Sequence, residues 1–96
     1  MVLAATTPGD CFYMALEAAR IAVTYRTPVI LLSDAYLANG TEPWLVPDVA
    51  SLPSFSPQFA NAPNHTNADG SQEFWPFQRD PETLARPWAP PGLAGL

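Results

Sequence analysis

Thr27-Pro-Val-Ile-Leu-Leu-Ser-Asp34, which continues as Ala-Tyr-Leu-Ala-Asn-Gly40-Thr-Glu-Pro-Trp44, is the most informative part of this sequence. Its centre, Val29–Leu32, is a continuous run of apolar, β-favouring residues. Such runs are typical of strands buried on both faces of a parallel sheet, whereas half-exposed antiparallel strands alternate apolar and polar residues. A buried strand needs neighbours, so the sequence predicts an α/β fold with a parallel sheet of which this chain supplies only a part.

The residues before this strand predict a helix from Thr7 to about Tyr25. Thr7 suits the N-cap, Pro8 suits the first helical position, and Asp10 is placed to meet the free N–H groups of the first turn. Apolar residues recur at three- and four-residue spacing and would form one face: Phe12, Ala15, Leu16, Ala19, Ala22 and Val23. The sequence therefore predicts one helix that packs its alanine-rich face on the sheet.

After Ser33 the chain leaves the predicted strand at its carboxyl end, where open α/β sheets place their ligand sites. Residues 35–39 are expected to form a short helical turn, with Gly40 as a left-handed cap. Asp34 therefore has two interpretations. Its carboxylate either orients a ligand or a neighbouring subunit, or it caps the turn that follows.

The second half of the chain is rich in proline, which removes a backbone donor and fixes φ. Of the 12 prolines, all but Pro8 and Pro28 lie from Pro43 onward. We expect an extended connector over residues 50–96 with little regular structure. A short helix is predicted near residues 80–86, with Asp80 as N-cap and Pro81 at the first helical position. The many aromatic residues of this half are unusual for a disordered linker, so we expect them to lie on another surface.

Composition excludes several classes of function. The net charge is −5 and no Lys/Arg cluster accompanies the aromatic residues, which argues against nucleic acid as a partner. No apolar run approaches the roughly 20 residues that cross a bilayer, and no signal peptide follows Met1, so we expect a cytoplasmic protein. The single cysteine, Cys11, excludes an internal disulfide and cannot by itself hold a metal or an iron–sulfur cluster.

Four motifs in one order carry a resemblance to a known family: Pro8-Gly-Asp-Cys-Phe12, Glu17-Ala-Ala-Arg20, the stretch from Thr27 to Asp48, and Arg79-Asp-Pro-Glu-Thr-Leu-Ala-Arg-Pro-Trp-Ala89. Over about Leu3 to Pro91 the chain resembles the alpha subunit of 2-oxoacid:ferredoxin oxidoreductases, most closely the 2-oxoglutarate type. The resemblance implies oxidative decarboxylation of a 2-oxoacid on thiamine diphosphate, transfer of electrons through an iron–sulfur cluster to ferredoxin, and formation of an acyl-coenzyme A.

The resemblance also implies how the work is divided. In this family the alpha subunit supplies a pyrimidine-binding α/β domain, while the beta subunit holds the diphosphate, the magnesium ion and the cluster. Residues 1–49 resemble the closing helix, strand and loop of the pyrimidine-binding domain, and residues 50–96 its connector to the next domain. The glutamate that activates thiamine lies earlier in that domain. We therefore expect no catalytic, cofactor-binding or metal-binding residue here, and an isolated chain without activity.

The chain departs from the family at two places. Ala35 stands where relatives usually have glycine, which would stiffen the loop. After Pro91 the expected continuation is replaced by Gly-Leu-Ala-Gly-Leu96, which suggests truncation or a change of reading frame.

The candidate site residues are candidates for a subunit interface. Asp34, Glu42 and Trp44 follow the predicted strand, and tryptophan is enriched among buried interface anchors. Packing of Glu42 and Trp44 over the sheet edge is the alternative. The expected partners are the beta subunit, the remainder of the alpha subunit and, through the complex, ferredoxin.

Other reactive side chains have simpler interpretations. Cys11 is expected to be a buried structural residue, since no histidine is near it in sequence to activate it as a nucleophile. His65 is expected to be an exposed loop residue. Arg79 and Arg86 could grip a carboxylate, but pairing with Asp80 or Glu82 is the commoner arrangement.

Two rival functions remain open. The first is a small non-catalytic interaction protein that docks through its proline- and aromatic-rich half. The second is a complete miniature α/β enzyme, which would need more strands than the sequence offers.

Overall fold

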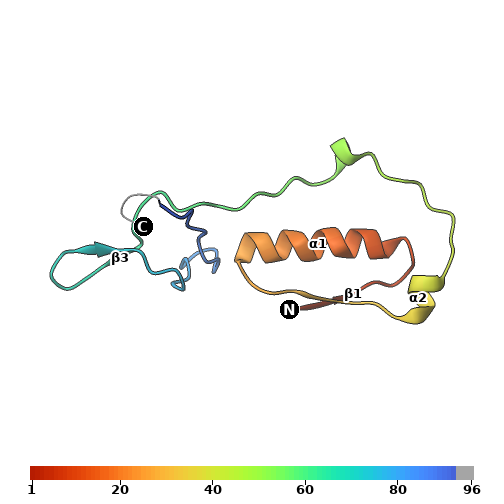
Figure 1. The fold of residues 1–96 in the computed structure, drawn as a ribbon, viewed down its shortest axis with the longest axis horizontal. Coiled ribbons are helices and arrows are strands. Elements are labelled where there is room, and N and C mark those ends of the chain that lie inside the picture. Colours follow the sequence, from red (N-terminus) through yellow and green to blue (C-terminus); the bar gives the residue numbers. More distant parts are fainter. Residues whose placement is uncertain (93–96) are drawn as a thin grey trace. The chain divides into compact units, whose positions relative to one another are not determined.

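The computed structural model describes residues 1–92 (Figure 1). Its elements are, in chain order, β1 (Val2–Ala4), α1 (Asp10–Tyr25), β2 (Ile30–Leu32), α2 (Ala35–Asn39), the 3₁₀ turn η1 (Val49–Ser51), β3 (His65–Thr66) and β4 (Gln72–Glu73). The chain forms two compact units. The first contains Met1–Val23 and Thr27–Phe55, and the second contains Thr24–Arg26 and the described residues from Ser56 onward. The sequence is expected to depart from the family after Pro91. Gly92 is described, and the remaining residues of that stretch, 93–96, lie outside the described residues.

A parallel β-α-β arrangement forms the first unit. β1 pairs with β2 in parallel, with Leu3 opposite Leu31, and the Ile30 N–H donates to the Met1 carbonyl at 3.0 Å. α1 connects the two strands and runs alongside them (Figure 1). The predicted fold class, a partial parallel sheet with a helix, is confirmed. β1 was not predicted, because three apolar residues at the start of a chain carry no periodicity.

The sheet is open to solvent in this chain. Ile30, Leu31 and Leu32 are 57, 39 and 52% exposed, so the prediction that they are buried is wrong for the described residues. Among those residues Ile21 of α1 is the buried hydrophobic side chain, at 7% exposure. Two strands and one helix cover too little of each other's apolar surface to close a core. The unit therefore presents a sheet without the neighbours that its sequence requires.

Helix α1 begins at Asp10, three residues after the predicted start. The Asp10 N–H donates to Thr7 Oγ1 at 3.1 Å, while the Asp10 carboxylate accepts from the Thr6 N–H at 2.9 Å. This reciprocal pattern resembles a capping box, so the carboxylate points back to Thr6 and not to the first turn as predicted. The predicted apolar face is also partly wrong. Ala15 and Ala19 are exposed, and the buried position is Ile21.

The end of α1 has a positive backbone φ. Arg26 has φ +47°, a left-handed conformation that ends the helix. Its guanidinium Nη1 donates to the carbonyls of Pro76 at 3.0 Å and Pro87 at 2.9 Å, and the group lies 5.5 Å from the ring centre of Trp88. These contacts within the second unit hold an unfavourable backbone conformation in place.

Helix α2 has the predicted bounds, but its end differs from the prediction. Gly40 has φ −72°, which is an ordinary extended conformation, so the left-handed cap predicted there is wrong. A side chain at this position would be crowded, since a Cβ on Gly40 would lie 3.0 Å from Pro8 Cγ. The loop after α2 thus passes very close to the turn before α1.

The second unit contains a hairpin that was not predicted. β3 and β4 pair antiparallel, with His65 opposite Glu73. In the connecting turn Gly70 has φ +85°, and the Asp69 carboxylate accepts from the Ser71 N–H at 2.9 Å. Asp69-Gly70 is a strong hairpin signal in a sequence, and the short flanking strands explain why it was overlooked.

The helix predicted near residues 80–86 is a turn. The Asp80 carboxylate accepts from the N–H groups of Glu82 at 3.0 Å and Thr83 at 2.7 Å, so its predicted capping role is present. Leu84, however, has φ +59°, and the Asp80 N–H donates to the Ala85 carbonyl at 2.9 Å. The chain therefore reverses direction after one turn and cannot continue as a helix.

Candidate functional site

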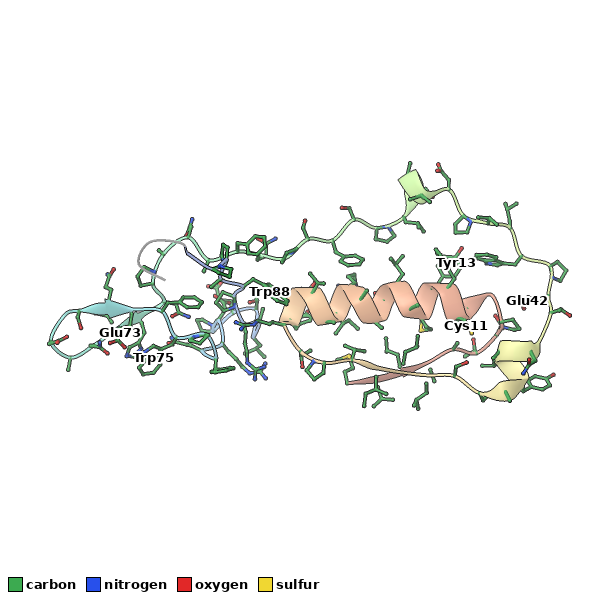
Figure 2. The ribbon with its side chains drawn as sticks, viewed as in Figure 1. Cys11, Tyr13, Glu42, Glu73, Trp75 and Trp88 are labelled. Carbon is green, nitrogen blue, oxygen red and sulfur yellow. The ribbon has the colours of Figure 1, made fainter. Side chains whose placement is uncertain are left out.

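The loop after α2 closes over the turn that precedes α1. Oε1 of Glu42 accepts hydrogen bonds from the Gly9 N–H and from the Thr7 hydroxyl, the latter at 3.0 Å. We call Thr7, Gly9, Phe12, Glu42 and Trp44 the Glu42 clasp. In Figure 2 Glu42 lies beside the end of α1 that carries Cys11. The carboxylate lies at the positive end of the α1 dipole, where an anionic side chain is favourably placed.

Gly9 makes the clasp possible because it has no side chain. A Cβ at this position would lie 2.6 Å from Glu42 Oε1 and 2.7 Å from Trp44 Cδ1. Both distances are far shorter than a van der Waals contact. The Pro8-Gly9 pair of the first motif is therefore matched to the Glu42 and Trp44 positions, which lie more than thirty residues later.

Trp44 packs against α1 with one side and faces solvent with another. Its ring centre lies 5.5 Å from that of Phe12 at an interplanar angle of 51°, and Phe12 in turn meets Tyr13 edge to face at 5.4 Å. Such tilted and edge-to-face geometries are the favourable ones for aromatic pairs. Trp44 nevertheless remains 42% exposed and Tyr13 44% exposed. The three rings form a fixed aromatic surface with free area.

Asp34 takes the capping role that the sequence left open. Its Oδ1 accepts the Leu37 N–H at 2.8 Å, at the start of α2. The structure thus brings Glu42 and Trp44 together on the first turn of α1 and leaves the Asp34 carboxylate at another helix. Thr7, Gly9 and Phe12 are the members of the clasp that sequence reasoning missed. The Pro8-Gly9 dipeptide at a helix start was the available signal.

The Glu42 clasp holds the loop and the Trp44 ring in place, and its five residues include neither a cysteine nucleophile nor a histidine base. The Cys11 sulfur donates to the Thr7 carbonyl at 3.6 Å, and the residue is half-buried, less than predicted. Within residues 1–92 no group of three or more His, Cys, Asp or Glu side chains could hold a metal ion. No helix in that part of the chain is long and apolar enough to cross a membrane. The arrangement suits packing and recognition.

His65 lies in a different environment from the one predicted. It is half-buried on β3, and its ring stacks on Trp75 with centres 3.4 Å apart and an interplanar angle of 16°. The Trp75 indole N–H donates to Glu73 at 3.1 Å, and this hydrogen bond is the main reason that the pKa of Glu73 lies below its usual range. Figure 2 shows Glu73 and Trp75 together on the hairpin.

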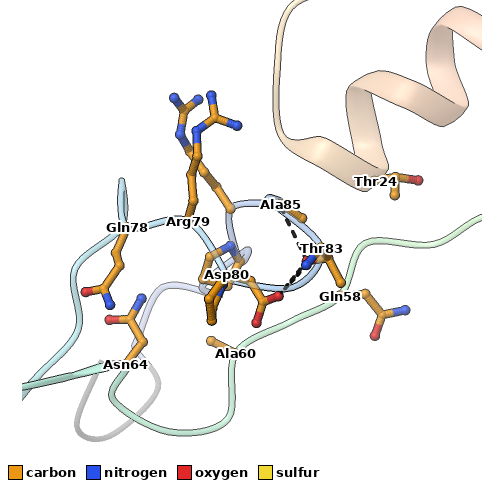
Figure 3. Close-up of a pocket in the computed structure, with 12 residues that line it drawn as sticks. Thr24, Gln58, Ala60, Asn64, Gln78, Arg79, Asp80, Thr83 and Ala85 are labelled. Carbon is orange, nitrogen blue, oxygen red and sulfur yellow. Dashed lines mark hydrogen bonds between the residues drawn. The ribbon is translucent and has the colours of Figure 1, made fainter.

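Arg79 and Arg86 line one pocket of the second unit (Figure 3). Arg79 Nη1 donates to the Leu84 carbonyl at 2.9 Å. Among the residues that the structure describes, neither arginine forms the ion pair with Asp80 or Glu82 that the sequence predicted. Asp80 Oδ1 instead accepts from the N–H groups of Glu82 and Thr83 in its own turn.

Comparison with known proteins points to one family. The family described as pyruvate flavodoxin/ferredoxin oxidoreductase, thiamine diphosphate-binding, matches residues 1–86. The chain is 55% identical over 95 residues to the 2-oxoglutarate oxidoreductase subunit KorA of Mycobacterium tuberculosis. The aligned part is 99% of this chain and 13% of that subunit, so the chain spans a small fraction of its relative's length. No solved structure matches the chain at a significant level.

Proposed function

Because the chain belongs to the thiamine diphosphate-binding part of the pyruvate flavodoxin/ferredoxin oxidoreductase family, we propose that it serves as a segment of the alpha subunit of a 2-oxoglutarate:ferredoxin oxidoreductase. The resemblance found in the sequence is confirmed by the KorA match. The assembled enzyme would decarboxylate the 2-oxoacid oxidatively, form an acyl-coenzyme A and reduce ferredoxin. This segment supplies scaffold and subunit interface to that enzyme.

The exposed sheet is the observation that supports this role best. β1 and β2 present apolar side chains, with Val2 at 55% and Ile30 at 57% exposure. Removing apolar area from water stabilises a protein by about 25 cal/mol per Å². Further strands and helices packed on this sheet would therefore add the hydrophobic stabilisation that this chain does not supply alone. The remainder of the alpha subunit is the natural source of those elements.

The Glu42 clasp supports an interface role for Trp44. The chain continues from Trp44 into Leu45 and Val46, which are 89 and 74% exposed. A tryptophan held rigidly on one side and followed by exposed apolar residues has the character of a binding anchor. We place the contact with the beta subunit, or with the next alpha-subunit domain, at Trp44. Glu42 fixes the loop, and Asp34 caps α2.

The cofactors of the complex fall outside this segment. Thiamine diphosphate supplies the carbanion chemistry when bound. Residues 1–92 contain no cluster of three or more His, Cys, Asp or Glu side chains that could hold a metal ion, and their single cysteine cannot by itself hold an iron–sulfur cluster. We assign these groups to the beta subunit. We also propose that residues 1–49 close the pyrimidine-binding domain and that residues 50–96 form the connector. A cytoplasmic location is part of the same proposal.

A segment exchange tests the proposal. The matched residues of the M. tuberculosis subunit would be replaced by this chain, and the chimeric subunit would be purified with its partner subunits. We expect assembly and 2-oxoglutarate oxidation within severalfold of the parent. A chimera that folds but neither assembles nor turns over would contradict the proposal. It would favour the rival, an independent interaction protein, whose supporting feature is the exposed apolar run after Trp44.

A further inference from the structure

The pocket lined by Arg79 and Arg86 lies wholly within the second unit and has a volume of about 480 Å³. That volume falls in the range of roughly 300 to 1,000 Å³ that is usual for small-molecule sites. Its walls include the polar side chains of Gln58, Asn64 and Gln78 (Figure 3). The pocket is distinct from the Glu42 clasp, which belongs to the first unit.

Arg86 carries the clearest sign of a missing partner. Its Nε is buried and has no hydrogen-bond partner within residues 1–92. A guanidinium is always charged and presents its donors in a planar fork, so a buried N–H without an acceptor costs desolvation free energy that nothing offsets. An acceptor from outside the described residues would remove that cost.

The charges around the pocket favour an anion. The chain has a net charge of −5 and only four arginines and lysines together, yet two of the four line this pocket. Asp80 also lines it, but its Oδ1 accepts from the Glu82 N–H, the Thr83 N–H and the Thr83 hydroxyl. These donors hold Asp80 in its own turn, and with Asp80 still charged the pocket lining carries two positive side chains against one negative. Neither arginine forms a salt bridge with a carboxylate of residues 1–92.

We propose that this pocket binds a small oxyanion, a carboxylate or a phosphate group, between Arg79 and Arg86. Arginine is the side chain best suited to such ligands, because two parallel N–H donors match two oxygen atoms of one anion. Arg79 already donates through Nη1 to the Leu84 carbonyl, which fixes the side chain and leaves its other N–H groups for a ligand. The inference rests on the pocket and does not require the proposed function.

Site-resolved modification by phenylglyoxal, read by mass spectrometry, tests the inference in the full chain and in the chimeric subunit. Inorganic phosphate and malonate are the two probes, and chloride at matched ionic strength is the control. We expect a bound oxyanion to slow modification of Arg86 at least about fivefold. Arg20, which pairs with Glu17 at 2.6 Å and lies outside the pocket, should not change. Protection by phosphate alone identifies a phosphate site, and protection by malonate alone identifies a carboxylate site.

Variants separate the site from simple charge screening. Arg86→Gln removes no hydrogen bond seen within residues 1–92 and should abolish anion protection at Arg79. Arg79→Gln should abolish it at Arg86, and Arg20→Gln should leave protection at both unchanged. Equal slowing of all arginines, or no slowing by either probe, would overturn the inference. So would an Arg86 that is unreactive without any anion in the assembled complex, because a protein group would then fill the pocket.

Discussion

Glu42 accepts a hydrogen bond from the Gly9 N–H, which lies 33 residues earlier in the chain. This bond joins the loop after the sheet to the turn that precedes α1 and sets the position of Trp44. Glu42→Ala should therefore release the loop. The Gly9 N–H should exchange with solvent about fivefold faster, corresponding to about 1 kcal/mol for a net hydrogen bond. Glu42→Gln keeps an acceptor and should show a smaller change. Equal exchange in all three proteins would contradict the clasp.

Gly9→Ala should displace the loop by steric conflict. The new Cβ would meet Glu42 Oε1 at 2.6 Å and Trp44 Cδ1 at 2.7 Å, so both side chains must move. We expect a large shift of the Trp44 indole signal in a ¹H–¹⁵N spectrum. Gly70→Ala is the matched control, since a Cβ on Gly70 meets nothing within 4 Å and strains only the hairpin turn. An unmoved Trp44 signal in Gly9→Ala would show that the close packing is wrong.

The Asp80 turn should depend on pH in a defined direction. Hydrogen bonds from the Thr83 N–H, then from the Thr83 hydroxyl, lower the pKa of Asp80 from its ordinary value of 3.8. A carboxyl whose pKa is lower in the folded turn stabilises it above pH 3.8. That contribution is lost as the pH falls through the lower, folded value. The carboxyl carbon shift of Asp80, followed by NMR against pH, measures this directly.

Thr83→Val removes one of the two Thr83 donors and should raise the pKa of Asp80 toward 3.8. Asp69 provides the control, because the pKa of its carboxyl is lowered chiefly by the Ser71 hydroxyl and should not respond. Ser71→Ala should raise the pKa of Asp69 and leave the pKa of Asp80 unchanged. A common shift of both carboxyl groups in either variant would mean that the turns are not independent.

The isolated chain should unfold without a sharp transition. Burial of Ile21 and the half-buried positions around it cannot offset the conformational entropy of a chain of this length, which is on the order of 1 to 2 kcal/mol per ordered backbone residue. Scanning calorimetry should show a broad, weak transition. A cooperative two-state peak would mean that the chain folds as an independent domain and would support the interaction-protein rival.

Elements with strong local signals were predictable from the sequence. The β2 run, the body of α1 and the five residues of α2 have the expected types, because periodicity and capping chemistry act over a few residues. The 80–86 turn shows the limit of such signals. Asp80 caps as expected. The left-handed conformation of Leu84 accompanies a hydrogen bond from the Asp80 N–H to the Ala85 carbonyl, which residue propensities do not predict.

The site was only half predictable for a similar reason. Glu42 and Trp44 were chosen for their place after a strand, and their partners Thr7, Gly9 and Phe12 come from the other end of the unit. Such contacts depend on tertiary packing, which a single sequence does not encode in its local pattern. The exposure of β2 differs from the prediction because the apolar run reflects a whole sheet, and residues 1–92 contribute the two paired strands β1 and β2 to it.

Hydrogen exchange at Leu31 tests the central claim that this sheet is completed by the rest of an alpha subunit. Ile30 donates to β1, so the alternation along a strand directs the Leu31 N–H to the open edge of β2. We predict rapid exchange of this amide in the isolated chain and slowing by about a hundredfold or more in the chimeric subunit, as in a paired core strand. Equally rapid exchange in an assembled, active chimera would contradict the account.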